Sequence, residues 1–231
     1  MEKICSFAAM KAEELVALTE EKVRTELASN GSGHDWYHVE RVRKAAMYIA
    51  KYEGNCSLLV VELAALLHDI ADHKYHDGDE EIGQKTAENF LSELGVEETI
   101  IDHIKKIIKE ISFKGAGVRS QMSTIEGKIV QDADRLDAIG AIGIARTFAY
   151  GGYKNRPMYD PNIKPVCHTS FAAYKVSTAP TINHFYEKLL LLKDLMNTKT
   201  GKAIAEKRHN VLTEFLSNFY QEWDGTDYQS E

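Results

Sequence analysis

An apolar segment in the first third of the chain reads Leu58-Leu59-Val60-Val61-Glu62-Leu63-Ala64-Ala65-Leu66-Leu67 and ends in His68-Asp69. Ser57, directly before it, is a favourable N-cap residue, so a helix is predicted from there to Asp69. A run this apolar belongs in a protein core. An imidazole beside a carboxylate is a good ligand pair for a divalent metal. The segment therefore predicts a core helix that ends in two metal ligands.

Two further groups of potential ligands lie before and after this segment. His38 lies in His34-Asp35-Trp36-Tyr37-His38-Val39-Glu40-Arg41-Val42, and an acidic cluster reads Asp132-Ala133-Asp134-Arg135-Leu136-Asp137. His38 precedes Val42 by four residues, so both lie on the same apolar face of a predicted helix. The order histidine, then His-Asp, then aspartate predicts one metal site built by three helices, because a site needs its ligands on rigid elements.

Composition and charge limit the classes of protein to which the chain can belong. It has 231 residues, 44% of them hydrophobic, and a formal net charge of −7. This acidity argues against a nucleic-acid polymer as partner, because binding such a backbone needs clustered Lys and Arg. Cys5, Cys56 and Cys167 are far apart and follow no CxxC pattern, which favours a reducing cytoplasm. Met1-Glu2-Lys3 leads into only a short apolar stretch. No apolar run approaches the roughly 18 residues of a membrane span. We therefore expect a cytoplasmic protein with no membrane partner.

Helical periodicity runs through nearly the whole chain, and strand-like alternation is absent. Helices are predicted over 6–29, 36–52, 57–69, 79–95 with Asp79 as cap, 99–111, from the capping-box pattern Ser123-Thr124-Ile125-Glu126 onward, 181–196 and 200–223. The helix from 123 either continues or breaks near Gly140 and Gly143. Residues 151–178 form a long irregular stretch, and loops of this length are often functional. The prediction is an all-α protein with a single domain.

The candidate metal ligands are His38, His68, Asp69 and Asp134. Two imidazoles and two carboxylates suit Mn(II), Fe(II), Co(II), Ni(II) or Zn(II) better than Mg(II), which prefers oxygen ligands throughout. Four protein ligands on an octahedral ion leave positions for water and for a substrate oxygen. The set therefore predicts a catalytic site, since an ion of this kind makes bound water acidic.

Three longer strings carry a family resemblance. They are 34–42, the segment Leu67-His68-Asp69-Ile70-Ala71-Asp72-His73-Lys74, and Ile129-Val130-Gln131-Asp132-Ala133-Asp134-Arg135-Leu136-Asp137-Ala138-Ile139-Gly140-Ala141. The match continues over 144–152 and from Asn183-His184-Phe185-Tyr186-Glu187-Lys188 onward. With these strings the chain resembles the HD-domain metal-dependent phosphohydrolases, whose pattern is H…HD…D, and within them the bacterial YpgQ/YedJ-type subgroup. The resemblance implies an HD-domain helical bundle over about 30–150 with additional C-terminal helices over about 180–223, in one domain of 1–231.

Two ligand assignments depend partly on this resemblance. The family places its first ligand before an xxRV element, which selects His38 over His34, in agreement with the helical periodicity. The family's usual Ala-Asp-Arg-Leu form selects Asp134 over Asp132. These two aspartates point about 200° apart on a helix, so only one of them can face the metal directly.

The resemblance also implies roles for residues around the metal. Similar enzymes have an acidic residue at the position of Asp72, which would orient or deprotonate the attacking water, although a turn-capping role is equally compatible with the sequence. Lys74, Arg135 and Arg146 are the candidate phosphate contacts, because a guanidinium can hold two phosphate oxygens. A second metal is an alternative, with its candidate ligands in the same loop: His73, His76, Asp77 and Asp79.

The expected activity is hydrolysis of nucleotides. Resemblance to the subgroup implies a pyrophosphohydrolase that cuts a (deoxy)nucleoside triphosphate to the monophosphate and pyrophosphate, with Mn(II) as the favoured cofactor and metal-activated water as nucleophile. The alternatives are a 5′-nucleotidase-type phosphomonoesterase and a catalytically silent nucleotide-binding or signalling module. A di-iron oxygenase would need further histidine ligands at defined places, for which the chain offers only the unaligned candidates His73, His76 and His103. The leucine run 189–192 indicates burial from several sides, for which internal packing is one interpretation and a homodimer interface another.

Overall fold

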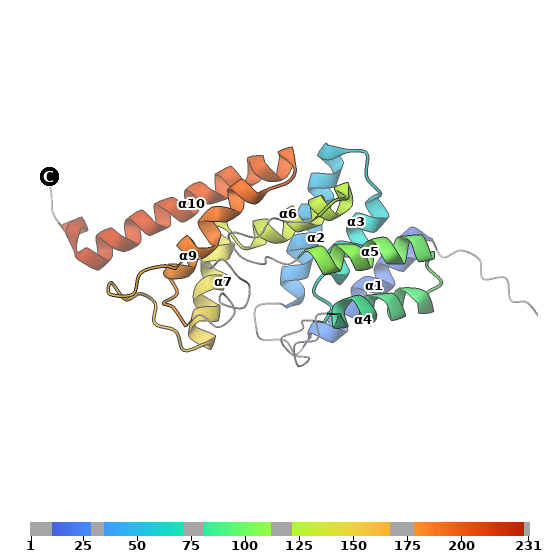
Figure 1. The fold of residues 1–231 in the computed structure, drawn as a ribbon, viewed down its shortest axis with the longest axis horizontal. Coiled ribbons are helices and arrows are strands. Elements are labelled where there is room, and N and C mark those ends of the chain that lie inside the picture. The colour runs from blue at the N-terminus through green and yellow to red at the C-terminus, as the bar shows by residue number, and fades with distance from the viewer. Residues whose placement is uncertain (1–10, 29–34, 72–80, 112–121, 167–177, 229–231) are drawn as a thin grey trace, which may run out of the picture. The chain divides into compact units, whose positions relative to one another are not determined.

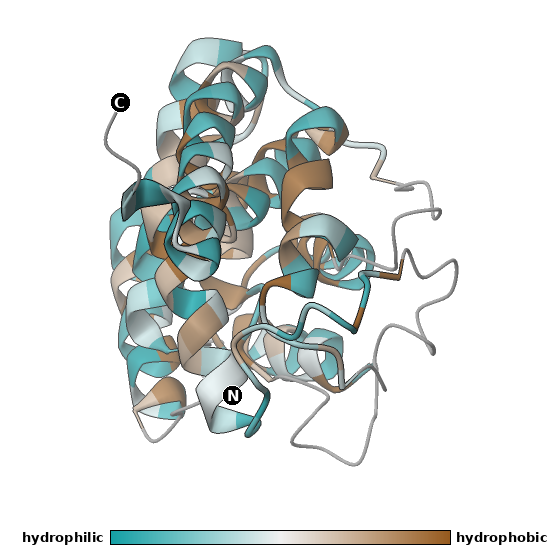
Figure 2. Ribbon diagram, turned by 90° about the vertical axis from the view of Figure 1, so that its left-hand side faces the viewer, coloured by the Kyte–Doolittle hydropathy of each residue, from teal (hydrophilic) through white to brown (hydrophobic). Residues whose placement is uncertain are grey.

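The computed structural model describes residues 11–28, 35–71, 81–111, 122–166 and 178–228. Within these ranges the chain forms helices joined by turns, and no strand occurs (Figure 1). The prediction of an all-α fold is confirmed. Brown and teal segments alternate along the helices in Figure 2, as expected for helices with one buried and one solvated face. No helix in the described part of the chain combines the length and apolarity needed to cross a bilayer.

The described residues divide into two compact units, and the division falls inside α6. The first unit contains α1 (Ala12–Leu27), α2 (Trp36–Glu53), α3 (Leu58–Leu67), α4 (Ile82–Glu93), α5 (Glu98–Glu110) and α6 (Ile125–Asp137) as far as Ala133. The second unit contains the end of α6, α7 (Gly140–Tyr153), α9 (Asn183–Glu187), the 3₁₀ helix η2 (Leu189–Leu195), α10 (Lys199–Asp224) and the 3₁₀ turn η3 (Thr226–Tyr228).

The core of the first unit is built around α3. Its side chains from Val60 to Leu67, with the exception of Glu62, are buried, and the helix contacts α1, α2 and α5. Ser57 caps it as predicted, because its hydroxyl accepts the backbone N–H of Val60. A helix that is apolar on all sides is stable only when other helices surround it. The local sequence therefore specifies both the helix and its central place.

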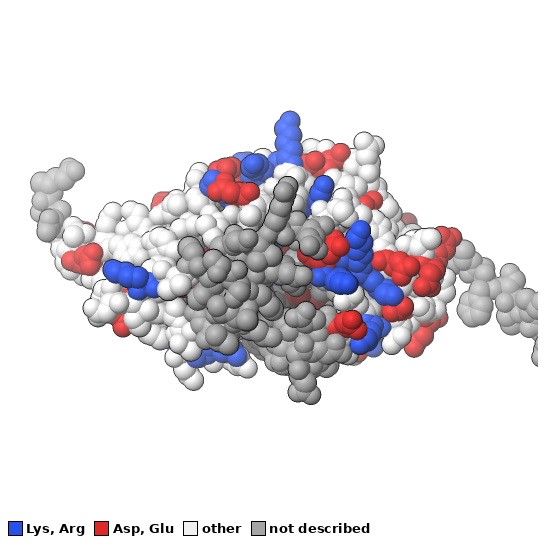
Figure 3. All heavy atoms as spheres, in the orientation of Figure 1, with Lys and Arg blue, Asp and Glu red and all other residues white. Residues whose placement is uncertain are grey.

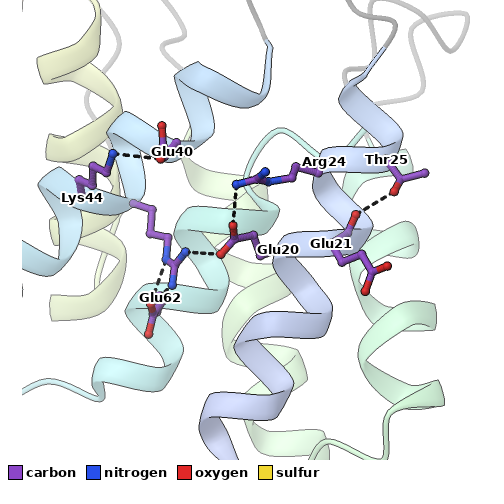
Figure 4. A network of polar contacts seen from close by, with 8 residues as sticks. Glu20, Glu21, Arg24, Thr25, Glu40, Lys44 and Glu62 are labelled. Atoms are coloured by element: carbon purple, nitrogen blue, oxygen red, sulfur yellow. Dashed lines mark hydrogen bonds and ion pairs between the residues drawn. The ribbon is translucent and has the colours of Figure 1, made fainter.

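A polar network joins the three helices α1, α2 and α3 (Figure 4). Arg43 of α2 donates to Glu62 of α3 from two nitrogens, at 2.6 and 2.9 Å, and to Glu20 of α1 at 2.7 Å. Arg24 donates to the second oxygen of Glu20 at 2.9 Å. The guanidinium of Arg24 also lies 4.5 Å from the ring centre of Trp36, the first residue of α2. These contacts fix how α2, which carries His38, lies against α3.

The predicted capping box at the start of α6 is wrong in detail. Thr124, not Ser123, accepts the backbone N–H three residues ahead, that of Gly127, at 3.2 Å. The carboxylate of Glu126 instead accepts the backbone N–H of Ser57 at 2.8 Å. Glu126 thus joins the start of α6 to the start of α3, a contact between residues too far apart in sequence for a local pattern to reveal.

Of the two alternatives for the helix that begins near residue 123, the break is correct. α6 ends at Asp137 and α7 begins at Gly140, whose φ is +74°. A side chain there would be strained, because L residues rarely adopt this conformation. A Cβ at this position would also lie 3.1 Å from the side chain of Arg208. Glycine therefore allows the chain to turn sharply while α10 passes close by.

The prediction of one α-helix over 181–196 is wrong. α9 ends at Glu187, Lys188 leaves helical geometry with φ −143°, and Leu189–Leu195 forms a 3₁₀ helix. With three residues per turn, residues i and i+3 of a 3₁₀ helix share a face. Leu189 and Leu192 are accordingly the buried members of this helix. The 3₁₀ helix buries the first and fourth leucines of the run and leaves the two between them partly exposed, so the run does not face the core throughout.

Helix α10 is the longest element of the second unit and contacts α7 and η2 (Figure 1). An aromatic cluster joins α7, α9 and α10, with Phe185 and Phe215 stacked at 5.6 Å, and with Phe148 tilted against Phe185 and edge to face with Phe215. Gly225, with φ +65°, ends α10 in the left-handed conformation typical of helix C-termini. The second unit thus has its own core.

Candidate metal centre

His38 is positioned by the first turn of α2. The side chain of Asp35 accepts the backbone N–H of His38 at 2.9 Å and so caps the helix. His38 therefore occupies the third helical position, and its residue surface is 1% exposed. A polar side chain withdrawn from water in this way needs a partner. The Asp35 cap fixes the end of α2 that carries His38.

His68 and Asp69 follow the last residue of α3. The Nδ1–H of His68 donates to the carbonyl oxygen of Ala65 at 2.9 Å. This hydrogen bond places the proton on Nδ1 and leaves a lone pair on Nε2, which is the arrangement of a metal-binding imidazole. The side chain of His68 is 1% exposed, whereas that of Asp69 is 22% exposed. The carboxylate thus lies at the solvent-facing edge of the site.

The ligand atoms of these three residues converge. Nε2 of His38 lies 3.2 Å from Nε2 of His68 and 3.3 Å from Oδ2 of Asp69, and the third side of the triangle, from His68 Nε2 to Asp69 Oδ2, is 3.5 Å. The imidazole rings lie edge to face, with centres 5.2 Å apart. Among the described residues these three side chains form a group able to hold a metal ion.

The triangle fits a divalent transition metal. At about 2.1 Å from each ligand atom, ligands at 90° lie roughly 3.0 Å apart and ligands at a tetrahedral angle lie roughly 3.4 Å apart. The observed separations of 3.2 to 3.5 Å agree with these values. Two nitrogens and one oxygen also form the mixed set preferred by transition metals.

The remaining predicted ligands fall in different parts of the chain. Asp132 is buried and belongs to the first unit, whereas Asp134 is partly exposed and belongs to the second. Both take part in polar interactions. Several further candidate residues lie outside the described residues, namely His34, Asp72, His73, Lys74, His76, Asp77 and Asp79. The segments 112–121 and 167–177 lie outside them as well. The fourth ligand therefore stays a prediction.

The two predicted phosphate contacts in the described chain have protein partners in the second unit. The guanidinium of Arg135 donates to the carbonyl oxygen of Leu195. Arg146 forms an ion pair with Asp137 at 2.6 Å. Each guanidinium has five N–H donors, so one such contact does not occupy all of its donors. The structure therefore gives both residues a role within the fold, and their role toward phosphate stays a prediction.

Two residues of this region had no functional role in the sequence interpretation. Asp35 was part of a quoted motif, and its position three residues before His38 at a helix start is the N-cap pattern that could have revealed its role. Glu126 was expected to cap its own helix but anchors the start of α3. His103, a loose candidate for an additional metal ligand, lies with its Nε2 3.7 Å from Oε2 of Glu126.

Comparison with known proteins identifies the class. Residues 35–139 match the HD domain. The chain is 38% identical to YpgQ of Bacillus subtilis (strain 168) over 209 residues, which are 90% of this chain and 93% of YpgQ. The protein belongs to the HD-domain family, and the matched segment contains His38, His68 and Asp69, whose ligand atoms converge. HD domains bind divalent metals, and together with a solved relative that is an HD-superfamily hydrolase this match makes the protein an HD-superfamily hydrolase.

Two solved structures support this membership. An HD-superfamily hydrolase from Bacillus thuringiensis is 46% identical, with a TM-score of 0.72 over 93% of this chain and 99% of that one. Bacillus subtilis YpgQ in complex with ADP is 34% identical, with a TM-score of 0.66 over 88% of this chain and 97% of that one. Both similarities extend over most of the chain and therefore include the C-terminal helices.

Proposed function

We propose that this protein is a metal-dependent nucleotide pyrophosphohydrolase that converts a (deoxy)nucleoside triphosphate to the monophosphate and pyrophosphate. The observation that carries the proposal is the convergence of His38, His68 and Asp69 within 3.5 Å of one another. The ADP complex of the YpgQ relative supports a nucleotide as the substrate class. The acidic composition and the mixture of both charges on the face shown in Figure 3 favour a small molecule over a nucleic-acid polymer.

In the proposed mechanism, His38, His68, Asp69 and Asp134 hold the ion, with Mn(II) favoured and Fe, Co, Ni or Zn as alternatives. When bound, the ion supplies Lewis acidity that polarises the phosphoryl group and makes water nucleophilic near neutral pH. Asp72 accepts the proton of the attacking water. The bond from the α-phosphorus to its bridging oxygen breaks, and pyrophosphate leaves. Lys74, Arg135 and Arg146 offset the triphosphate charge.

The experiment that tests this proposal is incubation of the full chain with Mn(II) and a panel of ribo- and deoxyribonucleotides, followed by chromatographic separation of the products. We expect equal amounts of monophosphate and pyrophosphate from a triphosphate. Orthophosphate released from monophosphates alone would indicate a 5′-nucleotidase instead. Nucleotide binding without any product would indicate a silent binding module.

A substitution connects the activity to the site. Asp69→Asn keeps the size of the side chain but removes the charge that a cation needs, so turnover should be lost while the helical circular dichroism signal is retained. Asp102→Asn is the matched control, because Asp102 is an exposed aspartate of α5 in the same unit. Equal activity of the two variants would contradict the proposal.

A further inference from the structure

A second concave site lies within the second unit. It is a pocket of about 220 Å³, lined by Tyr159, Pro161, Ile163, Lys164, Pro165, Asn183, Tyr186 and Tyr220. Most of these residues come from the segment between α7 and α9, and the remainder from α9 and the end of α10. None of them belongs to the metal centre.

The segment that forms one wall is held in place by hydrogen bonds at both ends. The N–H groups of Thr181 and Ile182 donate to the carbonyls of Pro157 and Met158 at 2.9 and 3.0 Å. Closer to the pocket, the side-chain amide of Asn183 donates to the carbonyl of Ile163 at 3.0 Å. The N–H of Val166 donates to Glu187 at 3.1 Å. Asn183 and Glu187 are 1% and 5% exposed, so the wall is tied to buried side chains and is preformed.

The tyrosines that line the pocket are also fixed. Tyr159 makes edge-to-face contacts with Phe219, Tyr220 and Trp223 of α10, with ring centres 5.7, 5.5 and 4.9 Å away. Tyr220 is hydrogen-bonded to Tyr186. Burial, followed by this hydrogen bond, raises the pKa of Tyr220 well above its ordinary value. The phenol is therefore neutral at physiological pH and remains a hydrogen-bond donor.

The charged side chain that lines the pocket is a cation. Lys164 is the only charged residue among the described residues that line it, and it makes no ion pair with any of the described chain. The nearby carboxylate of Asp160 accepts the backbone N–H of Asn162 at 2.8 Å and its side-chain amide at 3.1 Å. The Glu187 carboxylate is engaged with Val166. Both carboxylates keep their negative charge, but they bind N–H groups of the loop and neither lines the pocket, so Lys164 is the charge that a ligand in the pocket would meet.

We propose that this pocket binds a small anionic molecule with one aromatic ring. Rigid tyrosine and proline faces offer stacking surfaces for a flat apolar body. Lys164 and the phenol hydroxyls offer donors to a carboxylate or phosphate attached to it. The volume is below the roughly 300 Å³ at which pockets for larger ligands begin, which favours a single ring. Nothing in this inference depends on the proposed nucleotide hydrolysis.

Ligand-observed NMR titration of the full chain tests the proposal with benzoate and phenyl phosphate as probes. Benzyl alcohol, which lacks the charge, and acetate, which lacks the ring, are the control probes. All titrations contain a chelator, so that no probe binds through a metal. We expect benzoate and phenyl phosphate to bind about five- to tenfold more tightly than benzyl alcohol or acetate, as one charge-assisted contact allows.

Charge reversal at one residue locates the binding. Lys164→Glu should abolish the preference for benzoate over benzyl alcohol and create a preference for benzylammonium. Lys154→Glu is the matched control, because Lys154 is also exposed in the second unit but lies over the rings of Tyr150 and Tyr153. The control should bind as the unmodified chain does. Benzoate binding that is no tighter than that of acetate, or a preference for benzoate that survives Lys164→Glu, would overturn the proposal.

Discussion

Both units of the molecule contain imidazoles that are buried at least in part, but they surround them with opposite charges. In the first unit, the Nε2 atoms of His38 and His68 lie 3.3 and 3.5 Å from the Asp69 carboxylate. In the second unit, His184 lies near Lys188 and Arg156, and its pKa is lowered to about 3 by burial, with smaller contributions from these two cations. The first arrangement attracts a cation, and the second repels one.

The difference shows that burial of a histidine does not by itself identify a metal ligand. A carboxylate among the neighbours favours a bound cation, whereas burial, with a smaller contribution from adjacent Lys and Arg, favours the neutral imidazole. In the sequence both regions present a histidine on a helix among apolar residues, in 34–42 and in 183–188. Only the contacts between helices distinguish the two.

The largest effect is expected when the histidine of each region is replaced by asparagine. His38→Asn removes a predicted ligand and should lower the affinity for Mn(II) by at least about 100-fold, since even residues that merely orient ligands contribute 10- to 100-fold. His184→Asn should leave the Mn(II) affinity unchanged. Isothermal titration calorimetry of the two variants measures both effects. An equal loss of affinity in the two would mean that the charge environment does not decide where the metal binds.

The second test uses pH, because His184 titrates differently in the folded and unfolded chains. Its folded pKa of about 3 lies below the unfolded value of 6.5, so the unfolded state binds the proton more readily. Its contribution to stability is therefore complete above pH 6.5 and is lost as pH falls from 6.5 toward 3. The slope contributed by one proton is at most about 1.4 kcal/mol per pH unit. Urea unfolding between pH 4 and 7 should show a shallower pH dependence for His184→Asn than for the unmodified chain, and parallel curves would contradict the assignment.

The loss of stability on removing Arg43 or Lys193 compares a cation of each unit, and the expected effect is of intermediate size. Arg43→Met leaves the carboxylates of Glu20 and Glu62 without their shared cation, so the free energy of unfolding should fall by about 1–3 kcal/mol. Removing Lys193 of the second unit by Lys193→Met should lower stability less than Arg43→Met does, because its partners Asp194 and Glu206 are exposed to solvent. Chemical denaturation measures both values. A larger loss for Lys193→Met would show that the network does not hold the three helices together.

The smallest expected effect compares two helix caps. Ser57 caps α3 in the first unit and Thr198 caps α10 in the second, each accepting a backbone N–H. Ser57→Ala and Thr198→Ala should each lower stability by about 1 kcal/mol. Because α3 carries His68 and Asp69, only Ser57→Ala should also weaken Mn(II) binding measurably. Weaker binding in Thr198→Ala as well would indicate that the metal affinity follows overall stability.

Most helices could be predicted because their signals are local. Asp35 and Ser57 cap α2 and α3 at the positions where the apolar periodicity begins, and the observed bounds Trp36–Glu53 and Leu58–Leu67 follow closely. The prediction failed where a contact distant in sequence competed with a local one. Glu126 binds Ser57 instead of closing a capping box. The leucine run after Lys188 forms a 3₁₀ helix that buries Leu189 and Leu192.

The sequence by itself determined the all-α class, the residue types of the metal site and the family pattern, since each depends on neighbours within a few positions. Tertiary structure decided which side chains meet. His38 and His68 are 30 residues apart, yet their Nε2 atoms lie 3.2 Å apart because α2 and α3 pack together. The pocket within the second unit likewise depends on Tyr159, Asn183 and Tyr220 coming together. Packing of helices sets such distances, and a linear pattern of residue types contains no measure of them.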